Sequence, residues 1–519
     1  MTVTVPSSAG LTIISRPVAG GEIARRALTG ALDQWYARPP DTPDGWRERA
    51  RQVAAEFSGR DWRAQLALAF GARGAAAERL ARADVVVTTG QQPGLFGGPL
   101  YTLHKALTAL ALADTVEREA GVRVAPVFWA ATDDSDFAEA NHVGVVAGGA
   151  YVELRNARSD VAAGTSMSAT PLTDVSAARE LLERACGSAA NADVVQALRR
   201  AYASGATVGG AYLVFLRALL EPLGIPVLDA SHPAVRRAAA PVAQSALRNA
   251  AAVATAVDAR TTAIQSAGLS PQVAQVADLS LVFVTGEDGV RRRVALADAA
   301  RVAREADRET LSPNVLLRPI VERQILPTLT SVGGPGEIAY FAQSTAVADA
   351  LGVAVPLVVP RWSGIVIEPE VARALERLGL GIDDLRDPHA AERLVARRGL
   401  APEVRDALTR LRETLRHEAD TLDALVHHDE SLRRSVGSMR ATAEFRVERL
   451  ERRLAAAQKQ RGSPELRDVR LAQASLYPGG APQERVLSFV PLLARFGEEY
   501  VRGVITAATV LAMEIVRGV

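Results

Sequence analysis

The chain of 519 residues is poor in cysteine, lysine and aromatic residues. Its one cysteine, Cys186, excludes an intramolecular disulfide and any metal site built from several thiolates. The seven histidines do not show the H-x-x-x-H spacing that places two imidazoles on one face of a helix. We therefore predict no metal site, and we expect Cys186 to serve as a small apolar residue near a helix end.

The sequence also lacks a large excess of charge of either sign and a long apolar run. The 60 basic and 59 acidic side chains leave a net charge of +1, so no broad electrostatic case exists for binding nucleic acid or an anionic membrane. The N-terminus lacks the basic start and apolar core of a signal peptide. The most apolar stretch, 503–513, is about half of the roughly 20 residues that a membrane-spanning helix needs. We expect a cytoplasmic protein of two to four domains, with no nucleic-acid or membrane partner.

Lysine is almost absent because nearly every basic residue is arginine; Lys105 and Lys459 are the exceptions. Lys105 closes the segment 85–105, which reads V-V-V-T-T-G-Q-Q-P-G-L-F-G-G-P-L-Y-T-L-H-K. This pattern predicts a buried strand, a glycine-rich loop and the start of a helix. Glycine bares backbone amides, and a helix N-terminus followed by a cation favours an anionic ligand. Because the loop lacks the G-x-G-x-x-G order of dinucleotide sites, it is a weak signal by itself.

Strands and helices alternate around this segment and again later in the chain. The predicted strands are 85–88, 124–130, 224–229, 328–332 and 355–360, and the predicted connecting helices are 99–120 and 338–351. Two parallel strands joined through a helix form a right-handed crossover, the repeating unit of a doubly wound sheet. The sequence thus predicts an α/β fold with a Rossmann-like doubly wound core that is interrupted by helical insertions.

The flanking segments differ from the core in composition and in the spacing of their apolar residues, so we divide the chain into five parts. Residues 1–147 form the first part of the core with N-terminal helices, 148–223 a helical insertion, 224–367 the second part of the core, 368–475 a coiled-coil arm and 476–519 a C-terminal segment. Within 402–461, apolar residues recur every three or four positions between Arg and Glu. This phase slips near 427–429, which predicts two helical arms; the alternative is an amphipathic helix pair packed on its own domain.

An acidic run follows the predicted strand 124–130. Its polar residues are Asp133, Asp134, Asp136, Glu139, Asn141 and His142. In open parallel sheets, ligands bind at the carboxyl ends of the strands. Clustered carboxylates repel one another and need a cation, an amine or a proton between them. The alternative is a solvated turn in which Asp136 caps a short helix and Glu139 completes a capping box.

Further candidates fall at the same predicted edge of the sheet. Gly336 and Glu337 belong to a second glycine-rich loop, G-G-P-G-E at 333–337, and Arg361 follows the strand 355–360. Arg318 is a candidate for carboxylate recognition because the guanidinium fork matches two oxygens. After the coiled coil, S-L-Y-P-G-G-A-P-Q-E-R-V-L predicts a turn and a helix with a polar first turn. Taken singly, such residues more often form surface ion pairs or begin a helix. Several of them fall at the same edge of the sheet, and this argues for a binding site.

These segments resemble the BshC family, the cysteine-adding ligases of bacillithiol biosynthesis. The matching motifs are T-T-G-Q-Q-P-G-L-F-G-G-P-L-Y-T-L-H-K, P-V-F-W with its acidic run, G-P-G-E-I-A-Y, V-P-R-W-S-G and Q-E-R-V-L. Their order and spacing hold over nearly the whole chain. The resemblance implies a nucleotidyltransferase-like Rossmann core, a coiled-coil domain that supports a homodimer, and addition of L-cysteine to the amine of glucosaminyl-malate as the last step. It also implies a nucleotide site near the coiled coil and the C-terminal segment.

One departure concerns the acidic run, which reads Asp133-Asp134-Ser135-Asp136 where the family often has an acidic-His-acidic order. If a histidine were an essential base, His104 or His142 would have to replace it. The candidate catalytic residues are His104, Lys105, Asp133, Asp134 and Asp136. The candidate substrate-binding residues are Gly90, Gln91, Gln92, Asn141, His142, Arg318, Gly336, Glu337 and Arg361. The candidate nucleotide-binding residues are Gln483, Glu484 and Arg485.

Amide formation from a free carboxylate needs a better leaving group than hydroxide, so we expect ATP to activate the cysteine carboxylate. The amides of the loop 90–98, with His104 and Lys105, are expected to steady the phosphates. The aspartates are expected to hold the attacking amine and to remove a proton, and Arg361 and Arg318 to bind the malate carboxylates. The alternatives are a nucleotidyltransferase-like enzyme or amide hydrolase on another amine and carboxylate, and an inactive coiled-coil scaffold.

Overall fold

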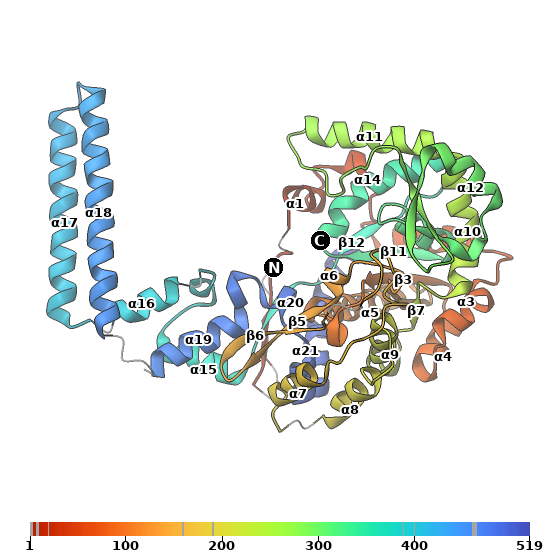
Figure 1. Ribbon diagram of the computed structural model, residues 1–519, viewed down its shortest axis with the longest axis horizontal. Coiled ribbons are helices and arrows are strands. Elements are labelled where there is room, and N and C mark those ends of the chain that lie inside the picture. Colours follow the sequence, from red (N-terminus) through yellow and green to blue (C-terminus); the bar gives the residue numbers. More distant parts are fainter. Residues whose placement is uncertain are drawn as a thin grey trace. The chain divides into compact units, whose positions relative to one another are not determined.

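The computed structural model describes residues 4–6, 10–18, 20–157, 160–188, 191–387, 389–398, 400–458 and 464–518 (Figure 1). The chain forms two compact units. The first comprises residues 1–147, 152–366 and 484–519, and the second comprises 148–151 and 367–483. The segment from 484 onward therefore packs within the first unit, although the sequence suggested a separate C-terminal segment from 476. In the described part of the chain, no helix is long and apolar enough to cross a membrane.

The first unit is built on a five-stranded parallel sheet. Its strand order is β12 (Val358–Pro360), β11 (Thr328–Gly333), β3 (Val85–Gln91), β4 (Val124–Ala130) and β7 (Val227–Asp229). The chain runs outward from β3 to β4 and β7, then returns to β11 and β12 on the other side of β3. This reversal between β3 and β11 is the topological switch point of a doubly wound sheet, where ligands bind. The predicted α/β Rossmann-like core is confirmed.

Two of these strands begin later than the sequence suggested. Strand β7 starts after Pro226 and β12 starts after Pro356, whereas the predictions began at 224 and 355. Proline has no N–H to donate to the ladder, although the Pro226 carbonyl still accepts from the Phe128 N–H at 2.9 Å. Helix α14 (Pro335–Leu351) starts three residues earlier than predicted, with proline at its first position.

Alternate side chains of the strands enter two different cores. Val85 and Val87 pack with helix α5 (Leu100–Ala120) on one face of the sheet, and Val86 packs on the other face. The first face is also covered by α2 (Pro43–Glu56) and α21 (Val490–Arg517), and α21 lies along α5. The second face carries α14. Helices on both faces bury the strands on both sides, which is why the strands are apolar throughout.

Smaller elements complete the first unit. A second, antiparallel sheet has the order β10 (Leu311–Pro313), β8 (Leu279–Thr285) and β9 (Arg291–Ala295). Strand β13 (Gly364–Ile367) joins β2 (Thr12–Ser15) and β1 (Thr4–Pro6) in a third sheet. The N-terminal helices are α1 (Glu22–Leu28), α2, α3 (Trp62–Phe70) and α4 (Gly74–Arg82). The later helices are α10 (Pro233–Arg248), α11 (Ala250–Ser266), α12 (Ala299–Glu305), α13 (Arg318–Ile325) and α20 (Gln483–Val486), and the single-turn 3-10 helices are Asp33–Trp35, Leu95–Gly97, Glu221–Leu223, Leu296–Asp298 and Arg308–Thr310.

The segment 148–223 is less helical than predicted. After the short helix α6 (Phe137–Ala140), strands β5 (His142–Ala147) and β6 (Ala150–Arg155) pair with each other. The helices of this segment begin only at α7 (Ser176–Ala185), followed by α8 (Ala192–Ala201) and α9 (Val208–Leu220). The prediction missed β6 because its residues, A-Y-V-E-L-R, are too few to show a clear period.

The second unit contains a long helical hairpin. Helices α17 (Pro402–Leu425) and α18 (Glu430–Gln458) lie side by side and are joined by a turn at 426–429, which confirms the predicted break (Figure 1). Leu400, Leu408 and Val447 form the core of this region. The remaining helices are α15 (Pro369–Leu378), α16 (Ala390–Arg398) and α19 (Pro464–Leu476), with 3-10 turns at Ile382–Leu385 and Pro478–Gly480.

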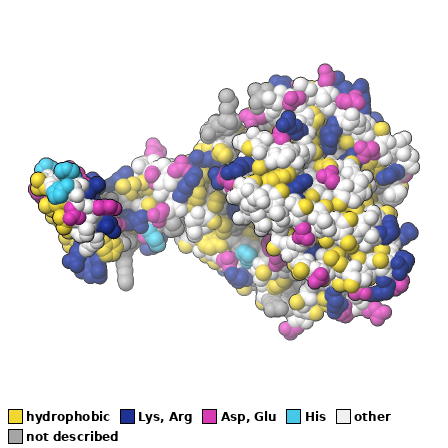
Figure 2. Space-filling model, turned by 90° about the horizontal axis from the view of Figure 1, so that it is seen from above, with side chains coloured by type: hydrophobic (Ala, Val, Ile, Leu, Met, Phe, Trp, Pro, Cys, Tyr) yellow, Lys and Arg dark blue, Asp and Glu magenta, His cyan; other side chains and the backbone are white. Residues whose placement is uncertain are grey.

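The face of the molecule in Figure 2 carries acidic and basic side chains mixed together, with no large area of one sign. This pattern agrees with the near-zero net charge of the sequence.

Candidate functional site

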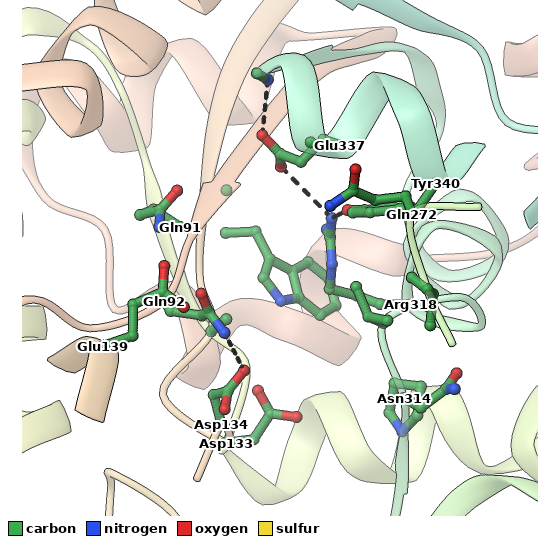
Figure 3. A pocket seen from close by; sticks show the side chains of 18 of the residues that line it. Gln91, Gln92, Asp133, Asp134, Glu139, Gln272, Asn314, Arg318, Glu337 and Tyr340 are labelled. Carbon is green, nitrogen blue, oxygen red and sulfur yellow. Dashed lines mark hydrogen bonds and ion pairs between the residues drawn. The ribbon is translucent and has the colours of Figure 1, made fainter. Parts of the chain in front are cut away.

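A cavity of about 620 Å³ opens at the carboxyl edge of the parallel sheet, beside the switch point between β3 and β11 (Figure 3). Its volume lies within the roughly 300–1,000 Å³ that is typical of small-molecule sites. Lys105, Asp134 and Glu337 all contribute to its lining, so three separate segments of the sequence meet here. The predicted residues that line the cavity are Gly90, Gln91, Gln92, Lys105, Asp133, Asp134, Arg318, Gly336, Glu337, Arg361 and Arg485.

Lys105 joins the two halves of the sheet across the switch point. Its Nζ atom donates to the Gly90 carbonyl at 2.9 Å and to Gln91 Oε1 at 2.8 Å, and it forms an ion pair with Glu337. Burial lowers the pKa of Lys105, and the neighbouring Glu337 carboxylate partly offsets this effect. Since an ammonium has three donors, these three acceptors saturate it. Lys105 therefore holds the edge of the cavity together.

Glu337 lies on the first turn of α14 and has three partners. Its carboxylate accepts a hydrogen bond from the Gly334 N–H at 2.8 Å, pairs with Lys105, and lies 3.8 Å from an Arg318 nitrogen. Arg318 in turn donates to the Tyr340 hydroxyl at 2.6 Å and to Glu322 at 3.1 Å. The N–H groups of Gly336 and Glu337 have no partner four residues earlier within the helix. The N-terminal turn of α14 thus lines the cavity through Gly334, Gly336 and Glu337, where the helix dipole favours negative charge.

The opposite wall of the cavity is acidic (Figure 3). Gln92 Nε2 donates to Asp134 Oδ2 at 2.7 Å, and the Asp134 carboxylate also accepts from the Asp136 N–H at 2.9 Å. Burial raises the pKa of Asp133, while the nearby Arg291 guanidinium opposes the shift. Glu139 lies on the same side (Figure 3). A wall of this charge favours an ammonium group or an amine.

Gly90 is required where β3 passes β4. A Cβ atom at this position would lie 2.9 Å from the Trp129 carbonyl oxygen and 3.1 Å from the Trp129 Cβ. Any larger residue would push the two strands apart and displace the carbonyl that Lys105 binds.

Comparison with known proteins gives a consistent result over most of the chain. The model of the BshC N-terminal Rossmann-like domain of bacillithiol biosynthesis matches residues 61–362, and the model of the BshC C-terminal coiled-coil domain matches 364–515. The chain belongs to the BshC family. A relative from Koribacter versatilis, named "Putative cysteine ligase BshC", is 33% identical over 83% of each chain. Relatives with the same name from Solibacter usitatus and Geobacillus kaustophilus are 32% and 30% identical, covering 80% of this chain and 80% and 81% of their own.

The glycine loop of the first BshC motif does not form the expected phosphate cradle. Only Gly90, Gln91 and Gln92 of the loop line the cavity. The N–H groups of Gly97 and Gly98 are bonded inside the loop, and the Leu100 N–H at the start of α5 donates to the Leu487 carbonyl at 2.8 Å. The N-terminus of α5 is therefore closed, and that of α14 is the one that faces the cavity.

His104 does not line the cavity, although it precedes Lys105. Successive helical residues point about 100° apart, so the two side chains face different directions. His104 is fully buried, its Nε2 lies 3.1 Å from the Tyr500 hydroxyl, and burial lowers its pKa. The expected contact of His104 with a phosphate is not possible in this arrangement.

Arg361 lines the cavity but is bound to another motif of the BshC family. Its guanidinium makes a bidentate pair with Glu484, at 2.9 and 2.7 Å, and both side chains are buried. Although burial raises the pKa of Glu484, Arg361 and His104 hold it well below its usual range. This pair uses the edge of Arg361 that was expected to bind malate. Of the predicted nucleotide-binding residues, Glu484 is thus in the interior, and Arg485 alone lines the cavity.

Four other candidates lie outside the lining of the cavity. Asp136 is exposed and caps α6, accepting from the Glu139 N–H at 3.2 Å, as the alternative interpretation had it. His142 Nδ1 lies 3.0 Å from Asn141 Oδ1 at the start of β5. Gln483 is buried and donates to the Ser475 carbonyl at 2.6 Å. These contacts are structural.

Sequence reasoning missed one wall of the cavity. The sheet β8–β9–β10 contributes Phe283, Arg291, Arg293 and Asn314. The apolar run 279–285, followed by the turn G-E-D-G and then by V-R-R-R-V-A at 290–295, carried the signal of a hairpin. The other missed residues of the lining include Tyr101, Trp129, Gln272 and Tyr340. Among the described residues, no group of three or more His, Cys, Asp and Glu side chains is arranged to hold a metal ion.

Proposed function

We propose that this protein joins the carboxylate of L-cysteine to the amine of glucosaminyl-malate, with ATP supplying the leaving group. Membership of the BshC family supports the reaction class. The observation that carries the proposal is the charge layout of one cavity, where an acidic wall faces the N-terminus of α14 across the switch point. An amine and an activated carboxylate need these two environments side by side.

The acidic wall is suited to the attacking amine. Asp134, oriented by Gln92, is in a position to hold the ammonium form of the sugar amine. Asp133 is the candidate base, because burial raises its pKa and a base works best when its pKa approaches the working pH. Loss of a proton to Asp133 would leave the neutral amine that attacks the carbonyl carbon.

The N-terminus of α14 is suited to the activated carboxylate. Attack of the cysteine carboxylate on ATP would form either an acyl-adenylate with release of pyrophosphate or an acyl-phosphate with release of ADP. The amine would then form the C–N bond and expel AMP or phosphate. The dipole of the N-terminal turn of α14, at Gly336 and Glu337, would stabilise negative charge on the phosphoryl group or on the carbonyl oxygen. Lys105 serves as a positioning residue that fixes the carboxylate of Glu337.

The test is an incubation of the purified protein with cysteine, glucosaminyl-malate and ATP. Mass spectrometry should detect the ligated thiol, and separation of the nucleotides should show AMP or ADP in equal amount. Asp134→Asn should reduce product formation about 100-fold or more. Asp84→Asn is the control and should leave it unchanged, because Asp84 precedes the first residue of β3 and forms an exposed pair with Arg123. Absence of product with varied nucleotides and divalent ions would refute the proposal.

We also propose that the helical hairpin mediates a homodimer. Several large apolar side chains of α17 and α18 are 41–67% exposed in the single chain: Leu411, Leu422, Leu425, Leu432, Met439, Phe445 and Leu450. A second copy of the hairpin would bury such side chains, as heptad-like spacing favours.

A further inference from the structure

The wall formed by β8, β9 and β10 presents a set of side chains that the proposed reaction has not yet used. Residues paired in register on neighbouring strands point to the same face, and Phe283 of β8 pairs with Ser312 of β10 and Arg293 of β9. Side chains two positions along a strand share that face, so Arg291 belongs to it as well. Arg292 points to the other side, where it is exposed and pairs with Asp288.

Three of the other four arginines that line the cavity are committed to protein groups, and the fourth, Arg485, is the candidate for the nucleotide. Arg361 holds Glu484, and Arg318 holds Glu322 and the Tyr340 hydroxyl. Arg291 lies over the Phe283 ring and bonds Ser312 Oγ at 3.2 Å and the Asp133 carbonyl. None of these three guanidiniums offers an unused fork to a ligand.

Arg293 differs from them. Its Nε and one terminal nitrogen donate to a single acceptor, the Ser280 carbonyl, at 3.0 and 2.8 Å. Within the described ranges of the chain, Arg293 forms no ion pair with a carboxylate. A guanidinium has five N–H donors, so the edge formed by its two terminal nitrogens remains open, and this edge matches the two oxygens of a carboxylate. The side chain is partly buried, and burial lowers its pKa.

Asn314 adds a fixed donor to the same wall. Its Oδ1 accepts from the backbone N–H groups of Leu316 and Leu317, at 3.1 and 3.0 Å. Because the oxygen is fixed by these two bonds, the amide nitrogen must point the other way. Asn314 lines the cavity, so this NH₂ group is the candidate donor for a ligand.

We propose that Arg293, assisted by Asn314, binds a carboxylate of the malate group of the acceptor. The inference rests on the proposed function and assigns one of its substrates to one wall. With malate on Arg293 and the amine at the acidic wall, the acceptor can lie in the cavity in only one direction. Arg293 is therefore a specificity-determining residue that selects amino sugars with an anionic aglycone.

The test compares two acceptors and two neighbouring arginines. Arg293→Gln should raise the KM for glucosaminyl-malate about 10- to 100-fold, the range expected for a lost hydrogen-bonded charge pair. The KM for cysteine should stay within about twofold. With methyl glucosaminide, which keeps the amine and lacks malate, Arg293→Gln and the natural protein should react equally slowly. Arg292→Gln is the matched control and should leave both acceptors unaffected. Calorimetry with glucosaminyl-malate alone gives a readout that does not need turnover.

A second variant covers the case in which Arg293→Gln fails to fold. Asn314→Asp keeps the acceptor for Leu316 and Leu317 but replaces the donor with a negative oxygen, and it should weaken binding of glucosaminyl-malate by a similar factor. If the natural protein ligates both acceptors with equal efficiency, or Arg293→Gln leaves the KM unchanged, the malate assignment is wrong while the ligase proposal stands. If the natural protein binds glucosaminyl-malate through Arg293 and forms no amide, the ligase proposal fails and the assignment stands. Absence of both binding and turnover overturns both.

Discussion

The pair of Lys105 and Glu337 allows a quantitative test of how the cavity is held together. Lys105→Met keeps the length of the side chain and removes the cation, which leaves the Glu337 carboxylate with the more distant Arg318 guanidinium, 3.8 Å away. Removing one partner of a buried pair costs about 3–5 kcal/mol. We expect a loss of about 3 kcal/mol in the unfolding free energy, at the lower end, because the Glu337 side chain is 19% exposed and keeps its bond from Gly334. Glu337→Gln should cost about 2 kcal/mol, since the amide oxygen can still accept from Lys105.

The double variant is the decisive measurement. With both charges gone, no ion remains buried and unpaired, so Lys105→Met with Glu337→Gln should cost about 2 kcal/mol less than the sum of the single variants. Urea unfolding followed by tryptophan fluorescence reports the first unit alone, because all five tryptophans lie in it. Arg123→Met, which breaks the exposed pair with Asp84, is the control and should leave the unfolding free energy nearly unchanged. Additive losses, equal to the sum within about 0.5 kcal/mol, would show that the two groups are not coupled.

Two further predictions concern the acidic wall and the hairpin. Because burial places the pKa of Asp133 above its ordinary value of 3.8, the ionised carboxylate lowers the stability of the fold at pH 7. Asp133→Asn should therefore raise the urea midpoint of unfolding at pH 7, while ligation falls at least about 100-fold. The gain in stability should shrink as the pH falls through the pKa of the folded state towards 3.8. A gain that does not change with pH would contradict the assignment. Leu425→Glu with Leu432→Glu places charges on side chains that are 67% and 48% exposed, so it should convert the proposed dimer to a monomer in analytical ultracentrifugation without lowering the thermal midpoint of the first unit; an unchanged mass would place the dimer interface elsewhere.

Much of the core could be predicted because its signals are local. The apolar runs of β3 and β4, the prolines at helix starts and the glycines at turns each report the backbone of a few neighbouring residues. The doubly wound order followed from two such units and from the handedness of their crossovers. The predicted edge of the sheet was correct for the same reason, since the carboxyl ends of parallel strands must meet.

The partners of the side chains could not be predicted in the same way. Arg361 and Glu484 are far apart in the sequence, so nothing local shows that they neutralise each other instead of binding a ligand. His104 is buried because Tyr500 of α21 packs against it. The sequence of α5 by itself does not show whether another helix covers that position. Arg293 was overlooked because three consecutive arginines are typical of a solvated surface. In a strand, however, side chains alternate between the two faces, so Arg292 points outward and its two neighbours point inward.

The packing of α21 on α5 also has a consequence for biosynthesis. Helix α5 leaves the ribosome early, but the helix that shields one of its sides is made only after the hairpin of the second unit has been synthesised. The strand that completes the switch point, β11, also arrives long after β3. A nascent chain therefore carries an uncovered apolar helix through most of translation, and such surfaces attract chaperones and promote aggregation. Expression at reduced temperature, or together with chaperones, should therefore raise the soluble yield of the protein.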